Sequence, residues 1–226
     1  MEHLSIKIND LPDEILILIL KKLYNADVLY SLTGVNKRFN TIAHNLTFAS
    51  QLTLFCEFDN VISRLPDPML DRICSQILPL IHHKIKSLKL ESTSMERILL
   101  ATNYPNLNEL GLYGVNVEKA LSLFTGRMSP PIVISSNLLE LHVHVVCFTD
   151  CLHLLDGRFN QLHTFHVDIS FISSDTLTIN NEEKLPNLTC FSLCCVMHAH
   201  DYDQLIVPLL HRMLNLEKLD LHLNNV

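Results

Sequence analysis

Histidine has the widest choice of chemistry in this chain, because an imidazole can ligate a metal or carry a proton near neutral pH. Three of the 13 histidines alternate with apolar residues in two short segments: His142 and His144 in the first, and His166 in the second. Asp168 continues the second alternation. Alternate side chains of a strand share one face. If the two segments are neighbouring strands about 4.8 Å apart, His142 lies beside His166 and His144 beside Asp168, a geometry that a metal site could use.

We nevertheless expect no metal site and no cofactor. A shallow, open sheet face offers no dry cavity and no second layer of residues to orient the ligands. The seven cysteines are odd in number and contain no CxxC pair, which is typical of free, mostly buried thiols. A zinc site from Cys147, Cys151 and either Cys190 or Cys194 is the alternative interpretation. The sequence also has no phosphate-binding glycine loop, nucleophile elbow or HExxH motif, so we expect no enzyme activity of its own.

A repeated pattern, apolar-x-x-apolar-x-apolar, predicts the elements that would position these side chains. It occurs six times, and its central residues are 22, 31, 24, 26 and 28 positions apart, at Leu88, Leu110, Leu141, Phe165, Phe191 and Leu219. Four of these spacings lie in the range of about 20–29 residues that is typical of leucine-rich repeats, which stack into parallel sheets, and the spacing of 31 needs a small insertion. This part of the chain therefore resembles a leucine-rich-repeat solenoid, with parallel strands on its concave face and mainly helices on its convex face.

Capping residues predict helices between the strands. Asp67 followed by Pro68 indicates a helix start, and apolar residues at helical spacing continue to Ile81. The segment from Thr93 to Glu96 has the form of a capping box. Asn116 is expected to cap a helix that reaches Phe124. The alternation of Leu52 and Leu54 predicts a further strand before the repeats.

The chain opens with six consecutive aliphatic residues, Ile15 to Leu20. Pro12, Asp13 and Glu14 before this run, and two lysines after it, suit the two ends of a helix. A helix that is apolar nearly all round must be covered on more than one side. Two short helices should follow, one capped by Asp27 and one capped by Asn36. Three such helices form too small a core to be stable alone, so the rest of the chain or a partner must complete the burial.

These helices resemble the F-box family. The resemblance covers about 35 to 40 residues and rests on the segment from Leu11 to Phe39, with Asn36 where the family often has Cys and Phe39 where it often has Trp. It implies docking onto a Skp-type adaptor and, through that adaptor, membership of a cullin-based ubiquitin ligase. The residues implied in the adaptor interface and the core beneath it are Leu11, Pro12, Ile15, Leu16, Ile19, Leu20, Leu29, Leu32, Val35 and Phe39.

The predicted fold class is therefore α/β, with three domains or segments. We expect a three-helix F-box at 8–46, a strand and helix at 47–84 that cap the solenoid, and about six irregular leucine-rich repeats at 85–226. The last repeat, with Leu219, Leu221 and Leu223, has no polar cap in the sequence. We expect the chain to be a piece of a longer solenoid or to self-associate through this edge.

Composition excludes several classes of partner. The net charge is −7, from 17 basic and 24 acidic residues, which is unsuited to general nucleic-acid binding. The start Met1-Glu2-His3 has no basic region before an apolar run, and six aliphatic residues fall far short of the ~20 that span a bilayer. We expect a cytoplasmic or nuclear protein without membrane contact.

Two functions agree with these features. The first is the substrate-recognition subunit of a Skp–cullin–F-box ubiquitin ligase, and the alternative is a leucine-rich-repeat interaction scaffold with no role in ubiquitination. In either case an unidentified protein should bind the concave face. The face is acidic, which favours a segment rich in Lys or Arg, and Tyr113 is a candidate aromatic anchor. The predicted binding residues are Glu109, Tyr113, Glu140, His142, His144, His166 and Asp168.

Overall fold

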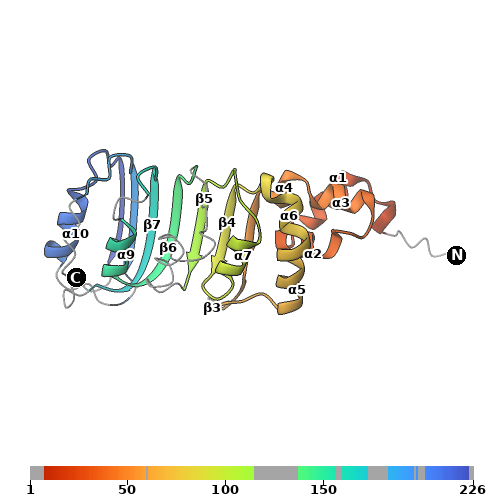
Figure 1. Ribbon diagram of the computed structural model, residues 1–226, viewed down its shortest axis with the longest axis horizontal. Helices are drawn as coiled ribbons and strands as arrows, with labels where there is room; N and C mark the ends of the chain where they lie inside the picture. The colour runs from red at the N-terminus through yellow and green to blue at the C-terminus, as the bar shows by residue number, and fades with distance from the viewer. Residues whose placement is uncertain are drawn as a thin grey trace.

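A seven-stranded parallel sheet forms the body of the protein in a computed structural model (Figure 1). The structure describes residues 8–59, 61–114, 137–155, 159–172, 183–195, 197 and 202–223. The strands lie side by side in the order in which they occur along the chain: β1 (Gln51–Leu54), β4 (Ser87–Glu91), β5 (Glu109–Tyr113), β6 (Glu140–Cys147), β7 (Thr164–Phe171), β8 (Cys190–Cys195) and β9 (Lys218–Leu223). This arrangement confirms the α/β class and the strand predicted at Leu52 and Leu54.

The central residues of the six sequence units align across the sheet. Leu88 pairs with Leu110, Leu110 with Leu141, and the same row continues through Phe165 and Phe191 to the last strand. The first five are completely buried, whereas Leu219 in β9 is 44% exposed. The spacing of the apolar pattern therefore predicted the strand register correctly, because a slip of one residue would turn these side chains to the opposite face.

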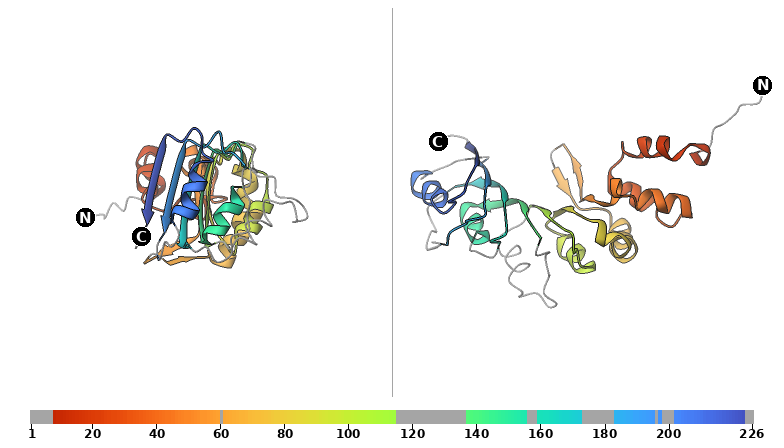
Figure 2. Two further views of the ribbon diagram at one scale, coloured as in Figure 1. Left: turned by 90° about the vertical axis from the view of Figure 1, so that its left-hand side faces the viewer. Right: turned by 90° about the horizontal axis from the view of Figure 1, so that it is seen from above.

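Helices lie along one face of the sheet in the view from above (Figure 2, right). They are α5 (Asp67–Arg72), a π-helical segment η2 (Ile73–Ile77), α6 (Leu78–Ile81), the short 3-10 helix η3 (His82–Lys84), α7 (Met95–Ala101), α9 (Phe148–Leu154) and α10 (Tyr202–Leu210). Helix α5 contains the predicted Asp67–Pro68 start. The helix predicted at Asn116 lies outside the described residues. We call the opposite side of the sheet the open face, which corresponds to the predicted concave face.

A buried carboxylate organises the turn between β4 and α7. Glu91 accepts hydrogen bonds from the backbone N–H groups of Thr93 and Ser94, at 2.6 Å and 2.7 Å, and from both of their hydroxyl groups. Ser94 is the N-cap of α7, but its side chain makes no capping bond to the helix. The predicted capping box from Thr93 to Glu96 is therefore wrong, because Glu91 of the strand accepts the Thr93 N–H that such a box would pair with Glu96.

Four helices form the N-terminal part: α1 (Asp13–Leu20), α2 (Asn25–Leu32), α3 (Lys37–Ala43) and α4 (Leu46–Ala49), preceded by the 3-10 helix η1 (Ile8–Asp10). The Asn36 side chain accepts the backbone N–H of Phe39 at 2.8 Å, which confirms the predicted cap of α3. The predicted cap of α2 at Asp27 is wrong, because the helix starts two residues earlier. Asn25 donates its side-chain amide to the carbonyl of Gln51, which fixes the chain ahead of Asp27.

The N-terminal helices and the sheet share one hydrophobic core. Ala26, Leu29, Ala43 and Ala49 pack into the same cluster as the strand leucines. The Arg72 guanidinium donates to the Thr33 carbonyl at 2.5 Å and lies 5.0 Å from the centre of the Tyr30 ring. These contacts cover one side of α2, α3 and α4 and so supply part of the burial that the small helical segment requires. Within the described residues, no helix is both long and apolar enough to span a membrane.

Candidate functional site

Helix α1 divides its aliphatic residues between a small core and the surface. Leu16 and Leu20 are buried in a cluster with Val28, Phe39, Ile42 and Phe48. On the other side Ile15 is 45% exposed, Leu18 58% and Ile19 50%, and Leu23 after the helix is similarly exposed. We call Ile15, Leu18, Ile19 and Leu23 the α1 patch. Contiguous exposed aliphatic side chains on one helix are typical of a protein-binding surface.

The structure separates the ten predicted adaptor residues into three groups by their exposure. Leu16, Leu20, Leu29 and Phe39 are buried, Leu11 and Leu32 are half-buried, and Pro12, Ile15, Ile19 and Val35 are exposed. The buried residues hold the helices together and reach no partner in this conformation. The exposed ones, together with the rest of the α1 patch, are available for contact.

Sequence reasoning missed two residues of this surface. Leu18 and Leu23 are absent from the predicted interface, although both are more than half exposed. Leu18 lies three residues after Ile15 and next to Ile19, and the i, i+3, i+4 rule places these three on one side of a helix. That spacing was the available signal. It could not show which side faces solvent, because the helix is apolar nearly all round.

Arg38 fixes the start of α1 against α3. Its guanidinium contacts the Asp13 carboxylate at 2.6–2.7 Å, donates to the Asn9 carbonyl at 2.7 Å, and also donates to the Leu11 carbonyl. The planar fork of arginine supplies several donors in fixed directions, which suits one side chain binding three groups. The position of the α1 patch therefore depends on a residue 25 positions away in the sequence.

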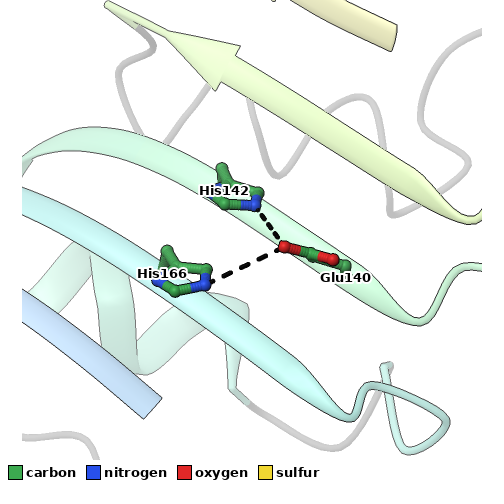
Figure 3. A group of neighbouring side chains, drawn as sticks. All are labelled: Glu140, His142 and His166. Carbon is green, nitrogen blue, oxygen red and sulfur yellow. Dashed lines mark hydrogen bonds and ion pairs between the residues drawn. The ribbon is translucent and has the colours of Figure 1, made fainter. Parts of the chain in front are cut away.

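The open face brings Glu140, His142 and His166 together (Figure 3). Nε2 of His142 lies 2.7 Å from Oε1 of Glu140, and Nε2 of His166 lies 3.9 Å from the same oxygen. The two imidazole rings stack with their centres 4.4 Å apart. Burial, followed by the nearby His142, lowers the pKa of His166. The pairing of His142 with His166 that the sequence predicted is confirmed.

Glu109 and Tyr113 lie on β5, nearer the N-terminal helices. Tyr113 packs edge-on against Phe55, with ring centres 5.1 Å apart. Burial raises the pKa of the Tyr113 hydroxyl, with smaller contributions from Asp168, Glu109 and Glu57. The hydroxyl therefore stays protonated and can donate a hydrogen bond to a partner. Next to Phe55 is an antiparallel hairpin of β2 (Cys56–Phe58) and β3 (Val61–Ser63), in which Phe58 and Val61 are exposed.

The other predicted residues of the open face are also in place. His144 pairs in register with Asp168, with His144 half-buried and Asp168 exposed. The alternative cysteine zinc site is not assembled. Within the described ranges, the group of Glu140, His142 and His166 is the one set of three or more His, Cys, Asp or Glu side chains close enough to share a metal. Cys151 is completely buried on the helix side of the sheet.

Comparison with known proteins addresses the N-terminal helices. No curated protein matches the chain. A family match covers the segment that carries the α1 patch, the Arg38 contacts and the small core beneath them. Residues 8–53 match the F-box-like family, and the chain therefore contains an F-box-like domain that spans α1 to α4 and most of β1.

Proposed function

We propose that this protein is the substrate-recognition subunit of a Skp–cullin–F-box ubiquitin ligase. In this proposal the F-box-like domain docks a Skp-type adaptor, and a leucine-rich-repeat solenoid built on the parallel sheet binds the substrate through its open face. The chain contributes binding surfaces, and other subunits carry out ubiquitin transfer. We further propose that it acts in the cytoplasm or the nucleus.

The observation that carries the proposal is the α1 patch within an F-box-like domain. Burial of an aliphatic side chain contributes about 1.5–3 kcal/mol when the whole side chain leaves water. Ile15, Leu18 and Ile19 are each about half exposed, so their burial in an interface would contribute about 2–4 kcal/mol together. That is enough to decide whether an adaptor binds at cellular concentrations.

Two features support a substrate role for the open face. The sheet keeps its strands in chain order and covers one face with helices, as stacked repeats do. The other face carries Glu109, Glu140 and Asp168, with the half-buried Tyr113 among them. An acidic surface with an aromatic side chain favours a basic protein segment.

Affinity purification of the tagged full chain from cells tests the proposal. We expect a Skp-type adaptor and a cullin to co-purify with the wild-type chain. Replacement of Leu18 and Ile19 by Ser should remove both, and replacement of Leu80 and Leu100, which are also exposed but lie outside the F-box-like domain, should remove neither. If neither the adaptor nor a cullin co-purifies with the wild-type chain, the protein is an interaction scaffold instead.

A further inference from the structure

We propose that Glu140, His142 and His166 form a binding site for a divalent transition-metal ion of the Zn²⁺ type on the open face. The three side chains offer one carboxylate oxygen and two imidazole nitrogens, all within 4.8 Å of one another. They extend from two neighbouring strands toward a common point (Figure 3). Neither the F-box-like match nor the proposed ligase function assigns a role to this group.

The backbone fixes the three residues before any metal arrives. His142 and His166 are paired in the β6–β7 ladder, and Glu140 precedes His142 by two residues and so shares its face. Both strands lie inside the sheet, between β5 and β8. The residues on either side of the two histidines are buried against the helix side: Leu141, Val143, Phe165 and Val167. A metal would therefore need only side-chain rotations, which is the condition for a preorganised site.

The distances between the ligand atoms are close to those found around a bound Zn²⁺ ion. Zn²⁺ holds nitrogen and oxygen ligands at about 2.0–2.2 Å, so tetrahedral donors lie about 3.3 Å from one another. The distances from the Glu140 oxygen to the two imidazole nitrogens are 2.7 Å and 3.9 Å, each about 0.6 Å from that value. Rotation about the side-chain bonds of Glu140 can correct both. In the absence of a metal, the N–H of His142 donates to this carboxylate, and the ion would replace that proton.

The ligand types select the ion. Imidazole nitrogen suits Zn²⁺, Cu²⁺, Ni²⁺, Co²⁺ and Fe²⁺, whereas Mg²⁺ and Ca²⁺ prefer oxygen. Three protein ligands leave at least one coordination position open. The sequence argued against a metal because a shallow, open face offers no dry cavity and no second layer of residues to orient the ligands. The structure instead shows all three side chains half-buried, with the two rings stacked on each other.

The open position would lie on the surface that we propose for substrate binding. An ion there could take a carboxylate, imidazole or thiolate of the partner as a further ligand. Metal binding by the chain alone does not depend on the proposed ligase function. A test on the purified chain therefore separates the failure of the two proposals.

Two experiments on the purified full chain test the site. Calorimetry follows its titration with ZnCl₂, and absorption spectroscopy follows its titration with CoCl₂. The test variants are His142→Ala, His166→Ala and Glu140→Gln. The control is His222→Ala, because His222 lies on the same sheet 3.1 Å from an acidic side chain, Asp220. Circular dichroism without metal checks that each variant folds, which we expect because the substituted side chains do not belong to the buried core.

In the presence of excess Mg²⁺, we expect the wild-type chain to bind one equivalent of Zn²⁺ at Glu140, His142 and His166. Each test variant should lower the affinity for this Zn²⁺ at least about tenfold, and His222→Ala should leave the affinity unchanged. The Co²⁺ complex should show visible absorption without a thiolate charge-transfer band. The proposal is overturned if folded wild-type chain binds no Zn²⁺, if the His142→Ala and His166→Ala variants bind as tightly as wild type, or if a thiolate band shows that cysteines hold the metal.

Discussion

Glu91 provides a direct test of how the sheet and its helices are joined. The residue is 5% exposed, and its carboxylate accepts four hydrogen bonds from Thr93 and Ser94, which hold the turn that starts α7. We predict that Glu91→Gln destabilises the protein. The glutamine has the same shape, but its NH₂ group must face one of the two pairs of donors, so a buried backbone N–H loses its acceptor.

The size of the effect follows from these contacts. A hydrogen bond to a charged group contributes about 1.5–3 kcal/mol, and a buried donor without a partner costs about 1–3 kcal/mol. Because the Ser94 or Thr93 hydroxyl can turn to accept from the new amide, we expect a net loss of about 3 kcal/mol in the free energy of unfolding. In a chain of 226 residues this lowers Tm by about 6–12 °C.

The pH dependence identifies the carboxylate as the cause. Burial raises the pKa of Glu91, but the hydrogen bonds from Ser94 and Thr93 outweigh it, so the pKa lies below the usual 4.5. A lowered pKa in the folded state stabilises the protein above the unfolded-state pKa, and this contribution is lost as pH falls through the folded-state value. The difference in Tm between wild type and Glu91→Gln should therefore be constant from neutral pH to about pH 5 and shrink below it.

Thermal unfolding followed by circular dichroism measures the effect, with Glu96→Gln in the first turn of α7 as the control. Equal Tm values for wild type and Glu91→Gln at pH 7 would contradict the reasoning. So would a difference in Tm that grows as the pH is lowered.

Two further predictions concern the core. Leu16→Ala should lower the free energy of unfolding by about 2–5 kcal/mol, because Leu16 is completely buried. Leu18→Ala, on the exposed side of the same helix, should lower it by less than about 0.5 kcal/mol in chemical denaturation, and equal losses would refute the assignment of the two sides. Tyr104→Phe should lower the free energy of unfolding by about 1–2 kcal/mol, because the buried Tyr104 hydroxyl donates to the Ile98 carbonyl at 2.5 Å. An unchanged denaturation midpoint would show that this hydrogen bond contributes nothing to stability.

The strand part of the fold was predictable because its signal is local and repeated. Each strand carries the same apolar pattern, and the pattern sets both the register and the buried face. The pairing of His142 with His166 follows from that register. The convergence of both rings on Glu140 does not, because it depends on side-chain rotamers that a sequence pattern leaves open.

The helical part was less predictable because several neighbouring residues there could each set the start of a helix. Asp27 is a good capping residue, but the contact of Asn25 with Gln51 sets an earlier helix start. The sequence likewise could not show that Glu91 turns into the β4–α7 loop instead of onto the open face. Its burial depends on donors from the loop that follows the strand.

Binding of a purified Skp-type adaptor to the purified full chain is the decisive measurement for the proposal that the α1 patch docks this adaptor. The variant is a triple substitution of the α1 patch, Ile15→Ser, Leu18→Ser and Ile19→Ser. The matched control is Leu80→Ser with Leu100→Ser, which removes exposed aliphatic residues outside the F-box-like domain. Thermal unfolding shows whether both variants retain the fold, as the exposure of these residues predicts.

We expect the wild-type chain to bind the adaptor and the control variant to bind it with the same Kd. The triple variant should bind about 30- to 1,000-fold more weakly, which corresponds to the loss of about 2–4 kcal/mol of aliphatic burial. Absence of binding by the wild-type chain would rule out a Skp-type adaptor as the partner, and an unchanged Kd for a folded triple variant would show that the α1 patch is not the docking surface.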